Sequence, residues 1–327
     1  MKIGIIGLGS MGKRRIRLIK ENFDATEIFG VDISEDRRNE VNNLFNITTY
    51  ESIDLLLENH KIESVFICTS PLSHSNIILN LLEKNINIFT ELNLVDDNYK
   101  MIMENSSKKG LLCFLSSTML YRKEIEFIEK KIQNSNEKIA YRYHVGQYLP
   151  DWHPWEKYKD FFVGNKRTNG CRELLAIELP WIIKIFGIVK KMTIIKDKIS
   201  KLNLNYDDIY LLMLEHENGC KGMINVDVVS REAIRNLEIY SENLHIFWNG
   251  TPNSLEIYNI NTKNREKINL YKDIEQDSRY AKNIIENAYL EEIREFFETL
   301  KSKNREPRYG FKDDLYIISL MNRIEGI

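Results

Sequence analysis

The sequence predicts an α/β fold in two parts: a parallel sheet over residues 1–120, then an α+β part with an open antiparallel sheet over residues 121–327. Three observations predict it. Short apolar runs alternate with amphipathic helical patterns in the first part, as in a doubly wound sheet. A glycine-rich turn joins the first run to the first helical pattern. In the second part, strand-like segments follow one another across short turns such as Glu217-Asn218-Gly219, which predicts hairpins.

The apolar run at residues 2–6 leads into a glycine-rich turn, Gly7-Leu8-Gly9-Ser10-Met11-Gly12. This spacing between a strand and a helix is typical of a dinucleotide-binding Rossmann unit. Gly7 allows a tight turn, Gly9 lets the backbone approach a pyrophosphate, and Gly12 lets the helix pack against the strand. Ser10 and Met11 begin the helix, whose free N–H groups and partial positive charge favour phosphate.

Asp32 ends the second predicted strand, about twenty residues past the last glycine, where a ribose-binding carboxylate belongs. A carboxylate there accepts hydrogen bonds from the ribose hydroxyls and repels a 2′-phosphate. The sequence therefore predicts NAD as the cofactor. Arg37 and Arg38 follow closely and leave NADP open.

Two later strands of the parallel sheet are followed by polar residues, at the edge where such sheets bind their ligands. The residues predicted to lie on the cofactor side there are Thr69, Ser70, Pro71, His74, Glu91 and Asn93. His74 begins a helix, so a packing role is the alternative for this side chain.

Length and composition narrow the class of protein. At 327 residues the chain is expected to form two domains, and its formal net charge of −2 gives no reason to expect nucleic acid or an acidic membrane as a partner. The four cysteines are scattered without metal-ligand spacing, so no metal site is expected. No apolar run is long enough to span a membrane and no leader segment is visible, so we expect a cytoplasmic protein.

The whole pattern resembles the glucose–fructose oxidoreductase, inositol dehydrogenase and MocA (Gfo/Idh/MocA) family. The glycine turn, the strand that ends in Thr69-Ser70-Pro71-Leu72-Ser73-His74, the segment Thr90-Glu91-Leu92-Asn93 and the C-terminal Glu292-Ile293-Arg294-Glu295-Phe296-Phe297 carry the resemblance. It implies hydride transfer between NAD(P) and a hydroxyl or keto carbon of a sugar, cyclitol or activated sugar. It also implies a homodimer or homotetramer built on the open sheet.

The sequence departs from the family at the residues that usually perform the chemistry. The lysine and proline of the family's E-K-P motif are Leu92 and Asn93 here. The histidine of the family's D-x-x-x-H helix falls on Glu178, and its aspartate on Leu174, next to Glu173. The usual acid–base groups are therefore missing, and other residues must take or give the hydroxyl proton.

Glu178 is the first candidate for proton transfer. It lies in the apolar run 174–183, and burial there would raise the pKa of its carboxyl toward working pH. A structural pair with Arg172 or a lysine is the alternative.

His153 is the second candidate, in a loop between Trp152 and Trp155. An indole face suits the C–H face of a sugar ring, and polar neighbours can bind its hydroxyls. Arg172 and Glu173 are further candidates for substrate binding. The alternative for the loop is an interdomain or dimer contact.

These observations predict an NAD(P)-dependent dehydrogenase or reductase for a sugar-like substrate. Two alternatives stay open: an enzyme that uses NAD transiently for elimination or hydrolysis without net redox change, and a cofactor-binding sensor without catalysis.

Overall fold

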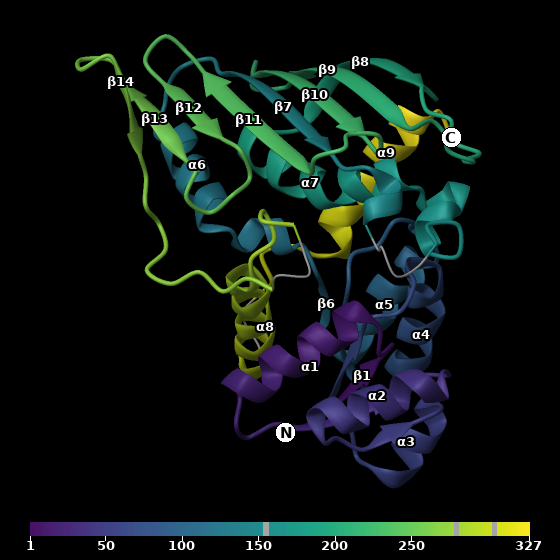
Figure 1. The fold of residues 1–327 in the computed structure, drawn as a ribbon. Coiled ribbons are helices and arrows are strands. Elements are labelled where there is room, and N and C mark those ends of the chain that lie inside the picture. The colour runs from purple at the N-terminus through teal and green to yellow at the C-terminus, as the bar shows by residue number, and fades with distance from the viewer. Residues whose placement is uncertain (153–156, 278–280, 303–305) are drawn as a thin grey trace. The chain divides into compact units, whose positions relative to one another are not determined.

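The computed structural model describes residues 1–152, 157–277, 281–302 and 306–327 (Figure 1). Backbone contacts group the chain into two compact units. The first unit comprises Met1–Ser117 and Leu290–Ile318, and the second comprises Thr118–Tyr289 and Ser319–Ile327. The expected domain boundary at residue 120 stays a prediction.

The first unit contains a six-stranded parallel sheet in the order β3-β2-β1-β4-β5-β6, as predicted. Its strands are β1 (Lys2–Ile6), β2 (Glu27–Val31), β3 (Thr49–Tyr50), β4 (Ser64–Ile67), β5 (Asn87–Thr90) and β6 (Cys113–Leu115). Its intervening helices are α1 (Ser10–Asn22), α2 (Glu35–Phe45), α3 (Ile53–Asn59), α4 (Pro71–Glu83) and α5 (Tyr99–Lys109). All four residues of β4 are buried, because helices cover both faces of a parallel sheet.

Helix α8 (Glu286–Lys301) packs its second half on the parallel sheet, although it lies far along the chain. Phe66, Phe89 and Phe114 extend from β4, β5 and β6, and the Phe296 ring meets them edge-on at centroid distances of 5.1, 5.6 and 5.7 Å. Edge-to-face aromatic contacts of this kind add to the free energy of apolar burial. The C-terminal region therefore completes the core of the first unit.

The second unit contains an eight-stranded sheet in the order β14-β13-β12-β11-β7-β10-β9-β8. Its strands are β7 (Ala140–Gly146), β8 (Val189–Asp197), β9 (Ile209–His216), β10 (Lys221–Asp227), β11 (Ile234–Tyr240), β12 (His245–Trp248), β13 (Glu256–Asn259) and β14 (Asn264–Lys267). Pairing is antiparallel except between β7 and β10, which run parallel. Parallel neighbours need a crossover, which the helix after β7 supplies, so the antiparallel prediction is confirmed with one exception.

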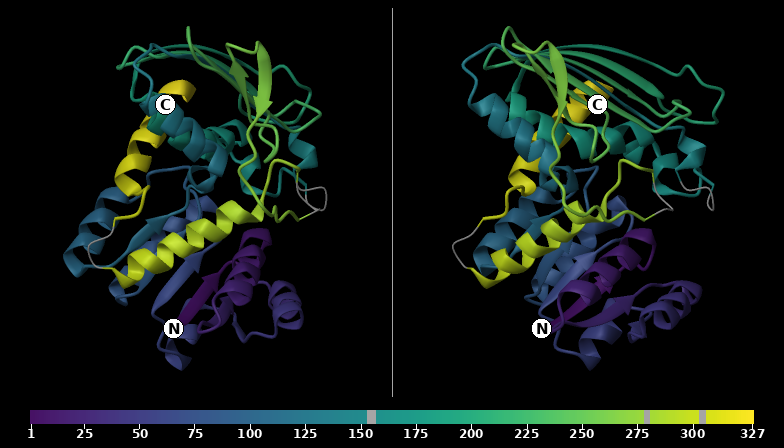
Figure 2. Two further views of the ribbon diagram at one scale, coloured as in Figure 1. Left: turned by 90° about the vertical axis from the view of Figure 1, so that its left-hand side faces the viewer. Right: turned by 60° about the vertical axis from the view of Figure 1, so that its left-hand side comes forward.

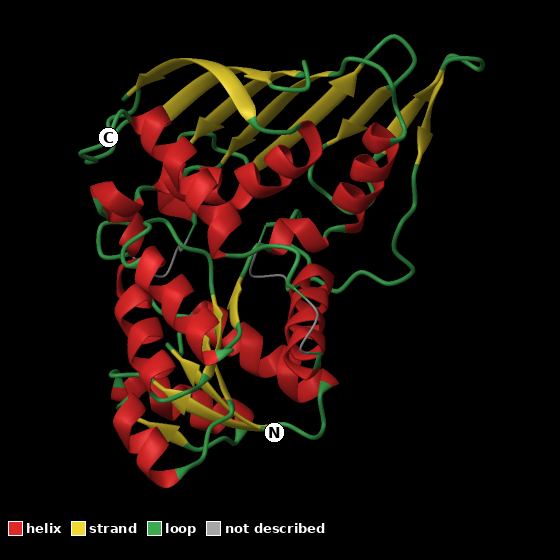
Figure 3. Ribbon diagram, turned by 180° about the vertical axis from the view of Figure 1, so that it is seen from behind, coloured by secondary structure: helices red, strands yellow, loops and turns green. Residues whose placement is uncertain are grey.

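Helices lie along one face of this sheet (Figures 2 and 3). They are α6 (Lys123–Gln133) and α7 (Gly170–Phe186), and α9 (Phe311–Glu325) ends in this unit. Tyr141 and Tyr143 of β7 point at α7: the first stacks on Phe186 at 3.9 Å and the second meets Trp181 edge-on at 5.3 Å. None of the described helices lies on the opposite face of the sheet.

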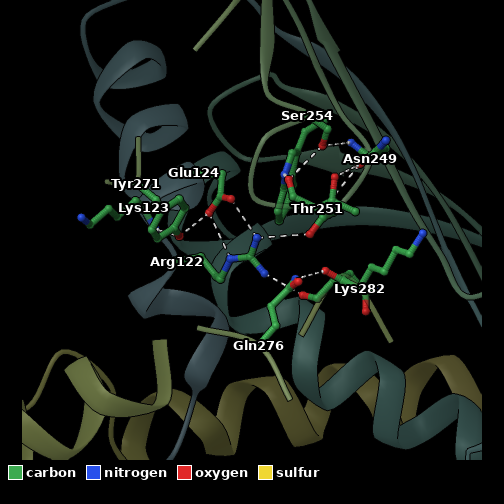
Figure 4. Close-up of polar contacts among 12 residues, drawn as sticks. Arg122, Lys123, Glu124, Asn249, Thr251, Ser254, Tyr271, Gln276 and Lys282 are labelled. Atoms are coloured by element: carbon green, nitrogen blue, oxygen red, sulfur yellow. Dashed lines mark hydrogen bonds and ion pairs between the residues drawn. The ribbon is translucent and has the colours of Figure 1, made fainter. Parts of the chain in front are cut away.

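A buried arginine ties the long segment after β14 to the start of α6 (Figure 4). The Arg122 guanidinium pairs with both carboxylate oxygens of Glu124 at 2.8 and 3.0 Å and donates to the carbonyls of Gly250 and Asn283. The Tyr271 hydroxyl donates to Glu124 at 2.7 Å. Each carbonyl and carboxylate here has a donor, as buried polar groups require.

Candidate functional site

The glycine turn after β1 has the geometry of an anion-binding loop. A Cβ on Gly7, whose φ is +90°, would lie 2.8 Å from the backbone of Cys68, and a Cβ on Gly12 would lie 2.0 Å from the Gly7 carbonyl oxygen. A Cβ on Gly9 would meet no heavy atom within 4 Å. Helix α1 begins at Ser10, and no side chain caps its N-terminus. The N–H groups of its first turn are therefore open to a phosphate.

Asp32 lies at the end of β2 with both carboxylate oxygens oriented by the backbone. Oδ2 accepts from the N–H of Leu8 at 2.8 Å, and Oδ1 accepts from that of Ser34 at 2.9 Å. A carboxylate has about four acceptor sites, so capacity remains for ribose hydroxyls. A guanidinium nitrogen of Arg37 lies 3.8 Å from Oδ2, while Arg38 donates to the Asp32 carbonyl at 2.8 Å. This arrangement fits the predicted NAD site.

His74 joins the ends of β4 and β5. It is 1 % exposed; Nε2 lies 2.9 Å from the Thr69 carbonyl oxygen, and Nδ1 lies 2.7 Å from Asn93 Oδ1. Burial lowers its pKa, so the ring is neutral at physiological pH. Ser70 and Pro71 form the start of α4, as helix N-cap and first helical residue. The structure thus brings His74 and Asn93 together, and their contact links the ends of β4 and β5.

Glu91 is held by a buried ion network that the sequence did not indicate. Arg15 of α1 donates to its two carboxylate oxygens at 2.7 and 3.1 Å and to Glu292 of α8 at 2.7 Å. Glu292 also accepts from Ser116 Oγ at 2.9 Å. Arg15 and Glu292 are fully buried. Helical spacing could have indicated that Arg15 is buried, because it lies one turn before the core residue Ile19 on the inner face of α1.

In the second unit, Glu178 lies on the sheet-facing side of α7 and is 1 % exposed. Oε2 accepts from the Tyr143 hydroxyl at 2.8 Å and from Trp181 Nε1 at 2.7 Å, and Oε1 accepts from Arg235 Nε at 2.8 Å. These three donors favour the structural alternative, with Arg235 as the partner in place of Arg172 or a lysine. Its catalytic role stays a prediction.

Arg172 is also engaged in a structural network. It is 2 % exposed, pairs with Glu325 of α9 and donates to Asn322 Oδ1 at 2.7 Å. The Asn169 side chain caps the N-terminus of α7 by accepting from the Arg172 N–H at 2.8 Å. The first turn of α7 is therefore held in place from two sides.

Glu173 lies in the same first turn and differs from these neighbours. Its Oε2 is buried and has no hydrogen-bond partner among the residues that the structure describes. Burial raises the pKa of its carboxyl to about 8. Trp152 lies next to this turn, because a Cβ on Gly170 would come within 3.6 Å of its indole ring. The structure thus brings two predicted substrate residues, Trp152 and Glu173, to the start of α7.

The loop that carries Trp152 is only partly described. Trp152 Nε1 donates to the Gln147 carbonyl at 3.1 Å. The predicted residues His153 and Trp155 lie outside the described residues. The following segment borders a hollow of about 550 Å³ lined by Pro150, Lys157, Tyr158, Lys159 and Asp160. Within the described ranges, no group of three or more His, Cys, Asp or Glu side chains is placed to hold a metal ion.

Residues 1–104 match the model of an oxidoreductase family with an NAD-binding Rossmann fold, GFO_IDH_MocA. The match lies within the first unit and indicates an NAD-binding Rossmann fold there. A curated relative, myo-inositol 2-dehydrogenase of Thermotoga maritima, is 24 % identical over 139 residues. That alignment spans 41 % of this chain and 41 % of the relative's length.

Solved structures share the fold of this chain over nearly its whole length. An oxidoreductase from Agrobacterium radiobacter in complex with NAD⁺, L-tartaric acid and magnesium has a TM-score of 0.81 at 14 % identity, covering 98 % of this chain and 94 % of its own. The WlbA dehydrogenase from Bordetella pertussis in complex with NADH and UDP-GlcNAcA has a TM-score of 0.79 at 13 % identity, covering 99 % and 94 %. At these identities the likeness shows the fold alone. Among the described helices, none combines the length and the apolar character needed to cross a bilayer.

Proposed function

We propose that this chain is an NAD(P)-dependent oxidoreductase that interconverts a hydroxyl and a keto carbon of a sugar, cyclitol or activated sugar. One observation carries the proposal: the uncapped N-terminus of α1 opens next to Gly9 in a domain that matches an NAD-binding family. The proposal for the substrate class is supported by the names of relatives, which include an inositol dehydrogenase and a UDP-N-acetylglucosamine 3-dehydrogenase from Acidithiobacillus ferrooxidans.

The residues proposed to hold the cofactor are Gly7, Gly9, Ser10, Met11, Gly12, Asp32, Thr69, Ser70, Pro71, His74, Glu91 and Asn93. The first turn of α1 would bind the pyrophosphate, and Asp32 would accept hydrogen bonds from the ribose. The nicotinamide ring, when bound, supplies two-electron redox chemistry. Glu91 and Asn93 are already bonded to Arg15 and His74, so their proposed role is to keep the ends of β4 and β5 in place.

The residues proposed to bind substrate come from the loop after β7 and the start of α7. Trp152 and Trp155 would offer apolar ring faces to a sugar, while Arg172 and Glu173 would offer polar contacts. Glu178 and His153 stay the acid–base candidates that the sequence names. The three donors around Glu178 favour a positioning role for it, through Tyr143 and Arg235.

We further propose that the protein is a homodimer or homotetramer that uses the helix-free face of the eight-stranded sheet. Four exposed apolar side chains share the part of this face formed by β8, β9 and β10: Ile195, Leu211, Met213 and Met223. An apolar stripe on a sheet face is typical of an interface.

Two assays test the proposed activity. Titration with NADH and NADPH, followed by nicotinamide fluorescence, tests cofactor binding. Incubation with NAD⁺ and a panel that includes myo-inositol and UDP-N-acetylglucosamine, followed by nicotinamide absorbance, tests turnover. Net NADH formation is the expected result. Product without net NADH would indicate the elimination or hydrolysis alternative, and cofactor binding without any turnover would indicate the sensor.

A further inference from the structure

Helix α7 carries two glutamates, Glu173 and Glu178, on different sides of its axis. Glu173 and Glu178 are five residues apart, which at 100° per residue places them about 140° apart around the helix axis. Glu178 points at the sheet, where Tyr143 and Arg235 bind it. Glu173 and Ile177, one turn apart, are the part-exposed positions in the first half of α7. The side of α7 that bears Glu173 is therefore less covered by the described residues than the side that bears Glu178.

The Glu173 carboxyl has the features of a proton-transfer group. Oε2 is buried with no partner in the described part of the chain, and Trp152 lies beside the same helical turn. A structural carboxylate at such a site would be paired, as Glu178 is, because an unpaired buried charge is costly. A group that must bind and release a proton needs an unfilled oxygen and a pKa near working pH.

The charged groups around the start of α7 are engaged elsewhere. Arg172 pairs with Glu325, and Asp227, at the end of β10, accepts from His144 and Ser230. Arg231, in the loop after β10, lies over the Tyr148 ring at 3.7 Å. Among the described residues, burial is the sole cause that raises the pKa of Glu173. The Glu173 carboxyl is therefore mostly protonated at neutral pH and ionises near pH 8.

We propose that Glu173 is the catalytic acid–base residue that exchanges a proton with the substrate hydroxyl; this inference rests on the proposed function. In the oxidation, the carbinol carbon gives up its hydrogen with both bonding electrons to NAD⁺, which is reduced to NADH. The hydroxyl proton passes to Glu173 Oε2, and the C–O single bond becomes a carbonyl. In the reduction, the Glu173 carboxylic acid returns the proton to the oxygen.

Glu173→Gln tests this role, because it keeps the shape of the side chain and removes the titrating group. The matched control is Glu217→Gln, an exposed glutamate in the turn between β9 and β10. With NAD⁺ and the first panel compound that yields NADH, we expect kcat of Glu173→Gln to fall roughly 100-fold or more, as when a general base is lost. NADH affinity should be unchanged, and Glu217→Gln should match the wild type. In the wild type, kcat/KM should rise with pH and level off above about pH 8, because the carboxyl of the free enzyme ionises there.

A second measurement does not depend on turnover. With ¹³C-labelled glutamate carboxyls, the resonance that disappears in Glu173→Gln belongs to Glu173, and its midpoint should lie near pH 8. A midpoint in the ordinary carboxyl range would overturn the inference. Full activity of Glu173→Gln would also overturn it and leave the proposed function standing. No NADH from any panel compound with the wild type would count against the proposed function and the inference together.

Discussion

At the residue scale, Glu173 and Glu178 of α7 differ in their hydrogen-bond partners, and this difference is the reason that proton transfer is proposed for Glu173. Glu178 is ordered by three donors, and removal of its charge would leave Arg235 uncompensated in a buried position. Glu173 has an oxygen without such a partner in the described chain. The donors around Glu178 compensate the burial of its carboxylate, whereas a buried oxygen without a partner lowers the stability of the fold.

Glu178→Gln should destabilise the second unit by about 3 kcal/mol, because it breaks a buried ion pair and places an amide N–H₂ among donors. Urea unfolding followed by tryptophan fluorescence measures this change. The double variant Glu178→Gln/Arg235→Met should recover part of the loss, since no charge is then left unpaired. Wild-type stability of the single variant would contradict the structural role.

The pH dependence of stability should report the raised pKa of Glu173. Between the unfolded pKa of 4.5 and the folded pKa of about 8, the folded chain holds a proton that the unfolded chain has lost. Stability from this group is therefore full below about pH 4.5 and is lost as pH rises through about 8. Glu173→Gln lacks this loss, so its free energy of unfolding should gain roughly 2–4 kcal/mol on wild type from about pH 5 to about pH 8.5. Parallel pH profiles for the two proteins would argue against the shift.

At the element scale, the turn into α1 contains two glycines with different roles: Gly12 is needed for packing, and Gly9 borders free space. Gly12 has no room for a side chain, because its Cβ would lie 2.0 Å from a carbonyl oxygen. Gly9 has room in the folded chain, and its φ of −70° is available to alanine. The two positions therefore separate folding from cofactor binding.

Gly9→Ala should leave thermal stability almost unchanged and weaken NADH binding at least about tenfold, because the methyl group would occupy space that the pyrophosphate needs. Gly12→Ala should lower the melting temperature by several degrees, since α1 must shift away from β1. Differential scanning fluorimetry and NADH fluorescence titration measure both effects. Equal NADH affinity of Gly9→Ala and wild type would place the pyrophosphate elsewhere.

At the scale of the whole molecule, the helix-free face of the eight-stranded sheet exposes large apolar side chains on adjacent strands. Ile195 and Met213 are both 65 % exposed on neighbouring strands. Their burial against a second copy would remove this surface from water.

Met213→Glu and Met223→Lys should each convert the proposed oligomer to a monomer, because a charge in the centre of an interface is costly to desolvate. Light scattering after size-exclusion chromatography gives the mass. The circular dichroism spectrum should be unchanged, which separates dissociation from unfolding. A wild-type monomer would rule out the proposed assembly.

The elements of this protein were largely legible in its sequence, because they depend on local patterns. The alternation of apolar runs and helical patterns predicted the parallel sheet of the first unit, and the turn at Gly219 forms the predicted hairpin between β9 and β10. The parallel alignment of β7 and β10 was not predicted, because strand pairing depends on how a distant segment returns to the sheet.

The sequence by itself determined the Rossmann domain and its cofactor class. The glycine spacing dictates the turn and the helix N-terminus, and the alternation of strands and helices places Asp32 at the end of the second strand. Tertiary structure alone decided which of the two carboxylates, Glu173 or Glu178, has hydrogen-bond partners. Sequence reasoning favoured Glu178 over Glu173, yet pairing depends on strands 35 and 57 residues away from Glu178. Likewise, only the fold brings Arg15 to Glu292, 277 residues along the chain. A side chain's charge state depends on its neighbours in space, which a local pattern does not specify.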